Sequence, residues 1–141
     1  MPNCSGKVCG NDGCGGSCGT CGPGTACNGG ACVAQGVTFS GSVYPIFVGA
    51  ACDACHGGAG SGGLDLSTSA GAHAELVNVP ASGCTGATRV VPGNPGASYL
   101  VSKLTGVGIC SGARMPQGGP YLSQAELDTI VAWIAAGAPN N

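Results

Sequence analysis

Residues 52–56 read Cys-Asp-Ala-Cys-His, a C-x-x-C-H pattern. This is the spacing at which c-type haem is attached to a polypeptide. Two thiols three residues apart on one turn of helix can reach the two vinyl groups at one edge of a porphyrin, and the next residue then lies beneath the iron. Cys52 and Cys55 are therefore predicted to form thioether bonds to a single haem c, and His56 is predicted to bind its iron.

Three other interpretations of this motif stay open. A redox C-x-x-C begins a helix within a βαβ pattern, and no strand is legible around Cys52 and Cys55. A structural zinc site needs two further ligands at similar spacing, and His73 is the only other histidine. A structural disulfide is the plainest alternative, because Cys18 and Cys21 form a second C-x-x-C, which is followed by glycine instead of histidine.

A second axial ligand for the iron must come from elsewhere in the chain. Met115 is one of only two methionines, and Pro116 and the pair Gly118-Gly119 favour an extended loop over a packed helix face. A thioether ligand also raises the reduction potential, which suits an electron carrier. We predict that Met115 binds the iron opposite His56, with His73 as the alternative ligand.

The composition excludes several classes of function. The 141 residues include 29 Gly, but only four Lys or Arg and six Asp or Glu, for a formal net charge of −2. There is no basic stripe for nucleic acid, electrostatic steering of a partner is expected to be weak, and no apolar run approaches the roughly 20 residues of a membrane span. Large side chains are scarce, so a buried prosthetic group or several disulfides are expected to compensate.

The eleven cysteines are unevenly distributed. Seven lie between Cys4 and Cys32 among glycines, without a helical or strand period, which predicts a small, disulfide-rich and mostly irregular module over residues 1–36. Its odd count allows at most three bridges there and leaves one cysteine over. Such cysteine usage is typical of oxidising compartments, so we expect a periplasmic or extracellular protein whose signal peptide is absent from this chain.

Residues 37–141 are predicted to be all-α. Four helices are expected, over residues 40–51, 70–79, 94–105 and 123–136. The last is the best defined, because Ser123 and Glu126 form a capping box and Gly137 follows its end. Its expected buried stripe consists of Leu127, Ile130, Val131 and Ile134.

This combination resembles class I monohaem cytochromes c, and more narrowly the cytochrome-c-like domains of bacterial envelope and secreted proteins. The resemblance covers residues 37–141 and rests on the C-x-x-C-H motif, the Met-Pro loop and the closing amphipathic helix, together with residues 43–47, 63–67, 89–93 and 133–134. It implies a class I cytochrome c fold, with three to four helices around one covalent haem and the last helix packed against residues 40–51.

The resemblance also implies further haem contacts. Tyr44, Phe47, Leu100 and Trp133 would line or back the haem pocket, and each is equally well interpreted as ordinary core. Arg89 would reach a haem propionate, because a buried carboxylate needs a charged partner; an exposed arginine is the alternative.

Two features depart from the family pattern. Cys84 and Cys110 lie outside the haem motif, and an oxidising compartment together with parity predicts a bridge between them. The module at residues 1–36 resembles small disulfide-rich modules of secreted bacterial proteins, for which binding of a surface or a protein and service as a spacer both stay open.

These features predict an electron-transfer protein and not an enzyme, with one six-coordinate haem that exchanges single electrons with redox partner proteins outside the cytoplasm. One alternative is a haem enzyme or sensor whose open sixth site binds a peroxide or a diatomic gas, so peroxidase-like activity stays open. Its distal acid or base would have to be His73, the only spare imidazole. A third possibility is a surface-binding module that carries the haem domain as cargo.

Overall fold

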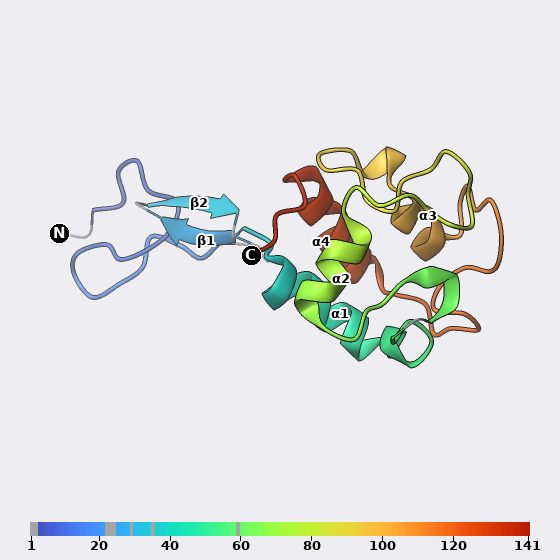
Figure 1. Ribbon diagram of the computed structural model, residues 1–141. Coiled ribbons are helices and arrows are strands. Elements are labelled where there is room, and N and C mark those ends of the chain that lie inside the picture. Colours follow the sequence, from blue (N-terminus) through green and yellow to red (C-terminus); the bar gives the residue numbers. More distant parts are fainter. Residues whose placement is uncertain (1–2, 22–24, 29, 35, 59) are drawn as a thin grey trace. The chain divides into compact units, whose positions relative to one another are not determined.

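The computed structural model describes residues 3–21, 25–28, 30–34, 36–58 and 60–141. The chain divides into two compact units, residues 1–36 and residues 37–141 (Figure 1), where the cysteine- and glycine-rich sequence gives way to the helical pattern. Among the described residues, no helix is long and apolar enough to cross a membrane.

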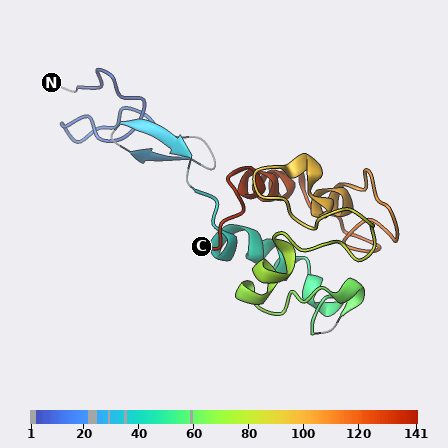
Figure 2. The same cartoon turned by 45° about the horizontal axis from the view of Figure 1, so that its top comes forward.

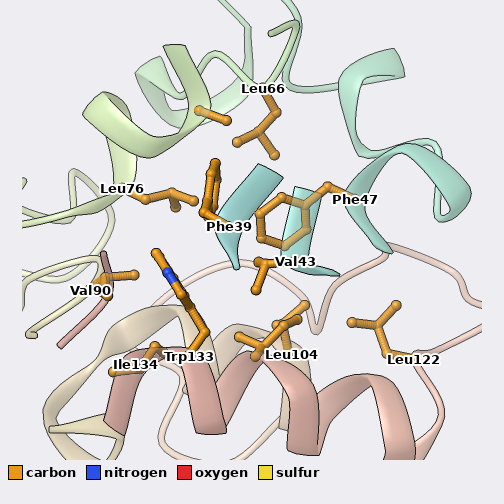
Figure 3. Packing of buried hydrophobic residues seen from close by; sticks show 13 residues of the cluster. Phe39, Val43, Phe47, Leu66, Leu76, Val90, Leu104, Leu122, Trp133 and Ile134 are labelled. Carbon is orange, nitrogen blue, oxygen red and sulfur yellow. The ribbon is translucent and has the colours of Figure 1, made fainter. Parts of the chain in front are cut away.

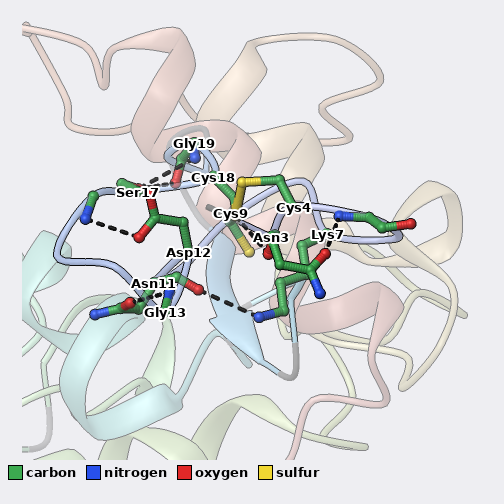
Figure 4. The surroundings of a disulfide bond; sticks show 12 residues. Asn3, Cys4, Lys7, Cys9, Asn11, Asp12, Gly13, Ser17, Cys18 and Gly19 are labelled. Carbon is green, nitrogen blue, oxygen red and sulfur yellow. Dashed lines mark hydrogen bonds between the residues drawn. A yellow bond between two sulfur atoms is a disulfide. The ribbon is translucent and has the colours of Figure 1, made fainter. Parts of the chain in front are cut away.

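Disulfides and one short hairpin organise the first unit. Cys4 is bonded to Cys18 (Figure 4), and Cys9 is bonded to Cys27, with Cα–Cα distances of 5.3 and 5.8 Å that are ordinary for a bridge. The strands β1 (Thr25–Asn28) and β2 (Ala31–Ala34) pair antiparallel. The sequence did not predict this hairpin, because strands of four residues are too short to show a period.

Asp12 stabilises the turns of this unit. Its carboxylate accepts hydrogen bonds from the N–H groups of Cys14 at 2.8 Å and Gly16 at 2.9 Å, and these bonds hold the pKa of Asp12 below its usual value. A Cβ atom at Gly16 would collide with the Asp12 carboxylate, which explains the glycine there.

The second unit is built from short helices joined by turns. They are η1 (Phe39–Val43), α1 (Tyr44–Gly49), η2 (Cys52–Ala54), η3 (Ser61–Gly63), α2 (Ser69–Leu76), η4 (Pro95–Ala97), α3 (Tyr99–Thr105) and α4 (Gln124–Ala135). The helix predicted over residues 40–51 therefore begins as a π-helical turn and continues as α1, which ends at Gly49. Ala51, two residues later, is left-handed with φ of 51°. Figure 2 shows these elements from a second direction.

The prediction of one helix over residues 94–105 is wrong. Ser98 is extended, with φ of −89° and ψ of 112°, and separates the 3-10 turn η4 from α3. The Ser98 hydroxyl lies 2.9 Å from both the Asn94 carbonyl and the Val91 N–H, and the next two N–H groups bond to the carbonyls of Thr88 and Arg89. The helical ladder is broken because these tertiary bonds replace it.

The prediction for the start of the last helix is confirmed. The Glu126 carboxylate accepts a 2.7 Å hydrogen bond from the Ser123 N–H, and the Ser123 hydroxyl accepts one from the Glu126 N–H. The buried stripe is shifted, because Trp133 is fully buried with Ile130 and Ile134, whereas the predicted Leu127 and Val131 are only half-buried.

The core of the second unit lies where η1 contacts both α2 and α4. Figure 3 shows the rings of Phe39 and Phe47 facing α4, from which Trp133 and Ile134 project. The ring centroids of Phe39 and Trp133 are 4.9 Å apart, within the range of favourable aromatic pairs. This cluster supports one wall of the neighbouring cavity, because Phe47 belongs to both.

Candidate cofactor site

A cavity of about 260 Å³ lies beside the core, and its walls are mainly apolar. It brings together residues that are far apart in sequence: Cys52 and His56 from the C-x-x-C-H motif, and Met115 from the loop before α4. Phe47 and Leu100 also line it, as the family resemblance implies. Arg89, also named from the sequence, lines the cavity as well. Sequence reasoning missed other lining residues, which include Ser61, Leu64, Leu66, Leu76, Ser82, Tyr99, Lys103, Leu104 and Ser111.

The C-x-x-C-H motif occupies a single helical turn. The N–H groups of Cys55 and His56 both donate to the Cys52 carbonyl, at 3.3 and 2.9 Å. Both cysteines are free thiols; Cys52 is half-buried against the cavity and Cys55 is exposed. The structure therefore contains no Cys52–Cys55 disulfide, although it pairs other cysteines of the chain.

The electrostatics of Cys52 do not suit a redox pair. Burial raises the pKa of the Cys52 thiol, and the nearby Asp53 and Cys55 raise it further. Reactive C-x-x-C thiols have a lowered pKa, because the thiolate is the nucleophile. The raised pKa means that Cys52 keeps its proton at neutral pH.

The imidazole of His56 is held in one tautomer. Its Nδ1 lies 2.8 Å from the Ser61 carbonyl oxygen, which can only accept a hydrogen bond. Nδ1 therefore carries the proton, and Nε2 keeps the lone pair that binds a metal. This arrangement is typical of a ligating histidine whose ring is oriented by a neighbouring acceptor.

The loop that follows His56 is closed tightly on itself. The Asp65 carboxylate accepts hydrogen bonds from the Ser67 N–H at 2.9 Å, from the Gly58 N–H at 3.1 Å, and from the Ser67 hydroxyl. These bonds lower the pKa of Asp65, with the Ser67 hydroxyl contributing most. A Cβ atom at Gly60 would come within 2.6 Å of the Cys55 carbonyl oxygen, so glycine is required for this close approach.

Met115 is half-buried at the cavity wall and packs against the hydrophobic core. Its N–H donates to the Lys103 carbonyl at 2.7 Å, which joins its loop to α3. The predicted disulfide between Cys84 and Cys110 is confirmed, with a Cα–Cα distance of 5.3 Å. This bridge fastens Cys110, five residues before Met115, to the segment that follows Ala81, Ser82 and Gly83, and these three residues line the cavity.

Arg89 lines the cavity, but its guanidinium is engaged by the protein. Nη1 lies 3.0 Å from the Glu75 carboxylate and 2.7 Å from the Glu75 carbonyl, and Nη2 donates to the carbonyls of Gly62 and Gly63, each at 3.0 Å. With 12% of its side chain exposed, Arg89 ties α2 to the η3 turn. A contact between Arg89 and a haem propionate stays a prediction.

Three other residues singled out in the sequence are absent from the cavity lining: Trp133 belongs to the core, and Tyr44 and His73 contact the core residue Phe39. The Tyr44 hydroxyl donates to the Leu66 carbonyl at 3.2 Å, and the Trp133 indole donates to the carbonyl of Pro139 at 2.9 Å. His73 lies 2.9 Å from the Ala138 carbonyl through Nε2. The role of His73 seen here is to hold the C-terminal tail.

Within the described residues, three metal-ligating side chains converge in the first unit, where the sulfurs of Cys9, Cys21 and Cys27 lie within 4.8 Å of one another. All three cysteines are disulfide-bonded, so they offer no thiolates.

No protein-family model matches the chain, and comparisons with characterised proteins and with solved structures find no match.

Proposed function

We propose that residues 37–141 form a single-electron carrier of class I cytochrome c type. In this proposal Cys52 and Cys55 hold one haem c, and His56 and Met115 are its axial ligands. The supporting observation is that a single apolar-walled cavity is lined by a free thiol, an imidazole of fixed tautomer and a thioether from a distant loop.

The residues at the cavity fit this group chemically. Each free thiol can add its S–H across a vinyl double bond, so nothing is released when a thioether forms. His56 offers a nitrogen ligand through Nε2, and Met115 offers a soft sulfur ligand that favours ferrous iron. When bound, haem would supply the one-electron iron couple, while Phe47, Leu100 and Leu104 exclude water from the site.

The lining favours a carrier over an enzyme. Among the described residues, neither Asp nor Glu lines the cavity, and the one imidazole there is that of His56. A peroxidase or a sensor with distal acid–base chemistry needs a second titratable group near the iron. Tyr99 and Lys103 also line the cavity, but their polar atoms are engaged by backbone groups of residues 110–113. His73 does not supply it, because its Nε2 is held at the Ala138 carbonyl.

The disulfides support an oxidising location. Bridges between Cys4 and Cys18, Cys9 and Cys27, and Cys84 and Cys110 are typical of exported proteins, so we place the carrier in the periplasm or outside the cell, exchanging electrons with redox partner proteins. Residues 1–36 then serve as a cross-linked appendage, for which binding to a surface or a protein is the natural role to test.

The first test is covalent attachment. After denaturing electrophoresis, haem should remain on the wild-type polypeptide and on a Cys14→Ala variant, a matched control because Cys14 is also free and exposed. The double variant Cys52→Ala/Cys55→Ala should carry none. Release of free haem from the wild type would refute the proposal.

The second test addresses the sixth ligand. Met115→Ala should abolish the long-wavelength sulfur-to-iron band, lower the reduction potential and let carbon monoxide bind the ferrous protein. His73→Ala should change none of these properties. Rapid binding of carbon monoxide by the wild type would instead establish an open sixth site and favour the enzyme or sensor.

A further inference from the structure

Met115 lies in the loop of residues 106–122, between α3 and α4. Of the residues that line the cavity, Lys103 makes the most hydrogen bonds to this loop. Its Nζ donates to the carbonyls of Ser111 and Ala113, each at 2.9 Å, while its own carbonyl accepts the Met115 N–H at 2.7 Å. One residue of α3 therefore binds the loop at three points. Two of these bonds carry a full positive charge on the donor, which makes them stronger than neutral hydrogen bonds.

The loop has few side chains of its own to pack. Its glycines Gly108 and Gly112 have positive φ values and no side chains to pack, and Val107 is 75% exposed. The lysine head group passes directly over Gly112, where a Cβ atom would lie 3.2 Å from Nζ. Lys103 thus occupies the space that the glycine leaves free.

Other contacts hold the residues on either side of Gly112, and one of them is the Ser111 hydroxyl, which donates to the Gly83 carbonyl at 2.7 Å. The Tyr99 hydroxyl accepts hydrogen bonds from the N–H groups of Cys110 and Ser111, and the disulfide anchors the same end. At the other end, Arg114 donates through Nε to the Leu104 carbonyl at 2.9 Å. The carbonyls on either side of Gly112 are those that Lys103 binds.

We propose that Lys103 is the positioning residue for Met115, because its ammonium group fixes residues 111–113 and thereby keeps the Met115 sulfur in the cavity. The inference rests on the proposed function and extends it, since it assigns the residue that controls whether the sixth site is occupied. Lys103 acts through the loop and touches neither the sulfur nor the iron. A role for its ammonium as a direct partner of a haem propionate is the competing interpretation.

The test compares Lys103→Met, which keeps the aliphatic stem and loses the donors, with Lys103→Arg, which keeps the charge and the donors. Lys7→Met makes the same charge change in the first unit, where Nζ bonds only weakly to the Asn11 carbonyl at 3.3 Å. All are measured as haem-loaded full-length protein. The readouts are the sulfur-to-iron band, carbon monoxide binding to the ferrous protein, and the reduction potential.

We expect Lys103→Met to raise the fraction of protein with Met115 unbound by about tenfold, equivalent to about 1.4 kcal/mol. The sulfur-to-iron band should weaken, carbon monoxide should bind about tenfold faster, and the potential should move toward that of Met115→Ala. Lys103→Arg should restore most of each signal, and Lys7→Met should match the wild type. In the Met115→Ala background, Lys103→Met should have no further effect on carbon monoxide binding, because the two residues act in series.

Two results would overturn the inference. One is a Lys103→Met protein with covalent haem and wild-type ligation; the other is an equal effect of Lys103→Met with and without Met115, which would assign Lys103 to the haem itself. If Lys103→Met does not fold, Lys103→Gln is the second variant, because it keeps a polar side chain but loses the charge and reach of the ammonium group, and it should weaken the same band. Absence of covalent haem from the wild type would refute the proposed function, a result distinct from either of these.

Discussion

Removing the bridge between Cys84 and Cys110 should destabilise the second unit strongly. The two cysteines are 26 residues apart in sequence, and closing a loop of that length in the unfolded chain corresponds to about 3.5 kcal/mol of chain entropy at 25 °C. Both positions are half-buried or exposed, so Cys84→Ser/Cys110→Ser adds little desolvation cost of its own. The expected loss of unfolding free energy is therefore about 3 to 4 kcal/mol.

Trp133 provides a specific assay for this loss. It is the only tryptophan of the chain and is fully buried, so its fluorescence reports unfolding of the second unit alone. With a urea m-value of about 1–3 kcal/mol/M, the midpoint should fall by more than about 1 M in non-reducing buffer. Cys14→Ser, which removes a free and exposed thiol, should leave the midpoint unchanged. A loss below about 1 kcal/mol in the double variant would refute the entropic reasoning.

Three further predictions concern thiols, pH and salt. Denatured, non-reduced protein loaded with haem should show one reactive thiol per chain, lost in Cys14→Ser, whereas three thiols would mean that Cys52 and Cys55 are unmodified. Because hydrogen bonds lower the pKa of Asp65, its ionised form stabilises the fold at neutral pH, and this contribution is lost as the pH falls below about 4. The urea unfolding midpoint of the wild type should therefore be higher than that of Asp65→Asn at pH 7. The difference between the two midpoints should shrink as the pH falls below about 4, and a constant difference would contradict this prediction. Electron exchange with a singly charged partner should change by only about two- to threefold between low and high salt, measured by stopped flow, because so few charges are available for steering.

Local signals in the sequence predicted local features correctly. The capping box of Ser123 and Glu126 depends on residues three apart, so it was visible before any fold was known. The bridge between Cys84 and Cys110 was predicted from parity, because these are the two cysteines that lie beyond residue 36 and outside the C-x-x-C-H motif.

Features that depend on tertiary hydrogen bonds were not visible. The break at Ser98 arises because its hydroxyl bonds to Asn94 and Val91, and no helix propensity encodes that choice. The roles of Tyr99 and Lys103 were missed for the same reason, although Leu100, Lys103 and Leu104 share the face of α3 that lines the cavity.

The three cationic side chains of the second unit all donate hydrogen bonds to carbonyl groups of the same unit. Of the four Lys and Arg residues in the chain, only Lys7 lies in the first unit, and each of the other three binds backbone carbonyls beside the cavity. Arg89 joins α2 to η3, Lys103 joins α3 to the Met115 loop, and the Arg114 guanidinium lies 4.0 Å from the ring centroid of Tyr121 while Nε bonds to the Leu104 carbonyl. Loops so rich in glycine have few side chains with which to pack, and hydrogen bonds from Arg and Lys side chains to backbone carbonyls hold them in place instead. The cations of the second unit are therefore committed to holding loops beside the cavity, and on the proposed function we expect recognition of a redox partner to depend on shape and apolar contact.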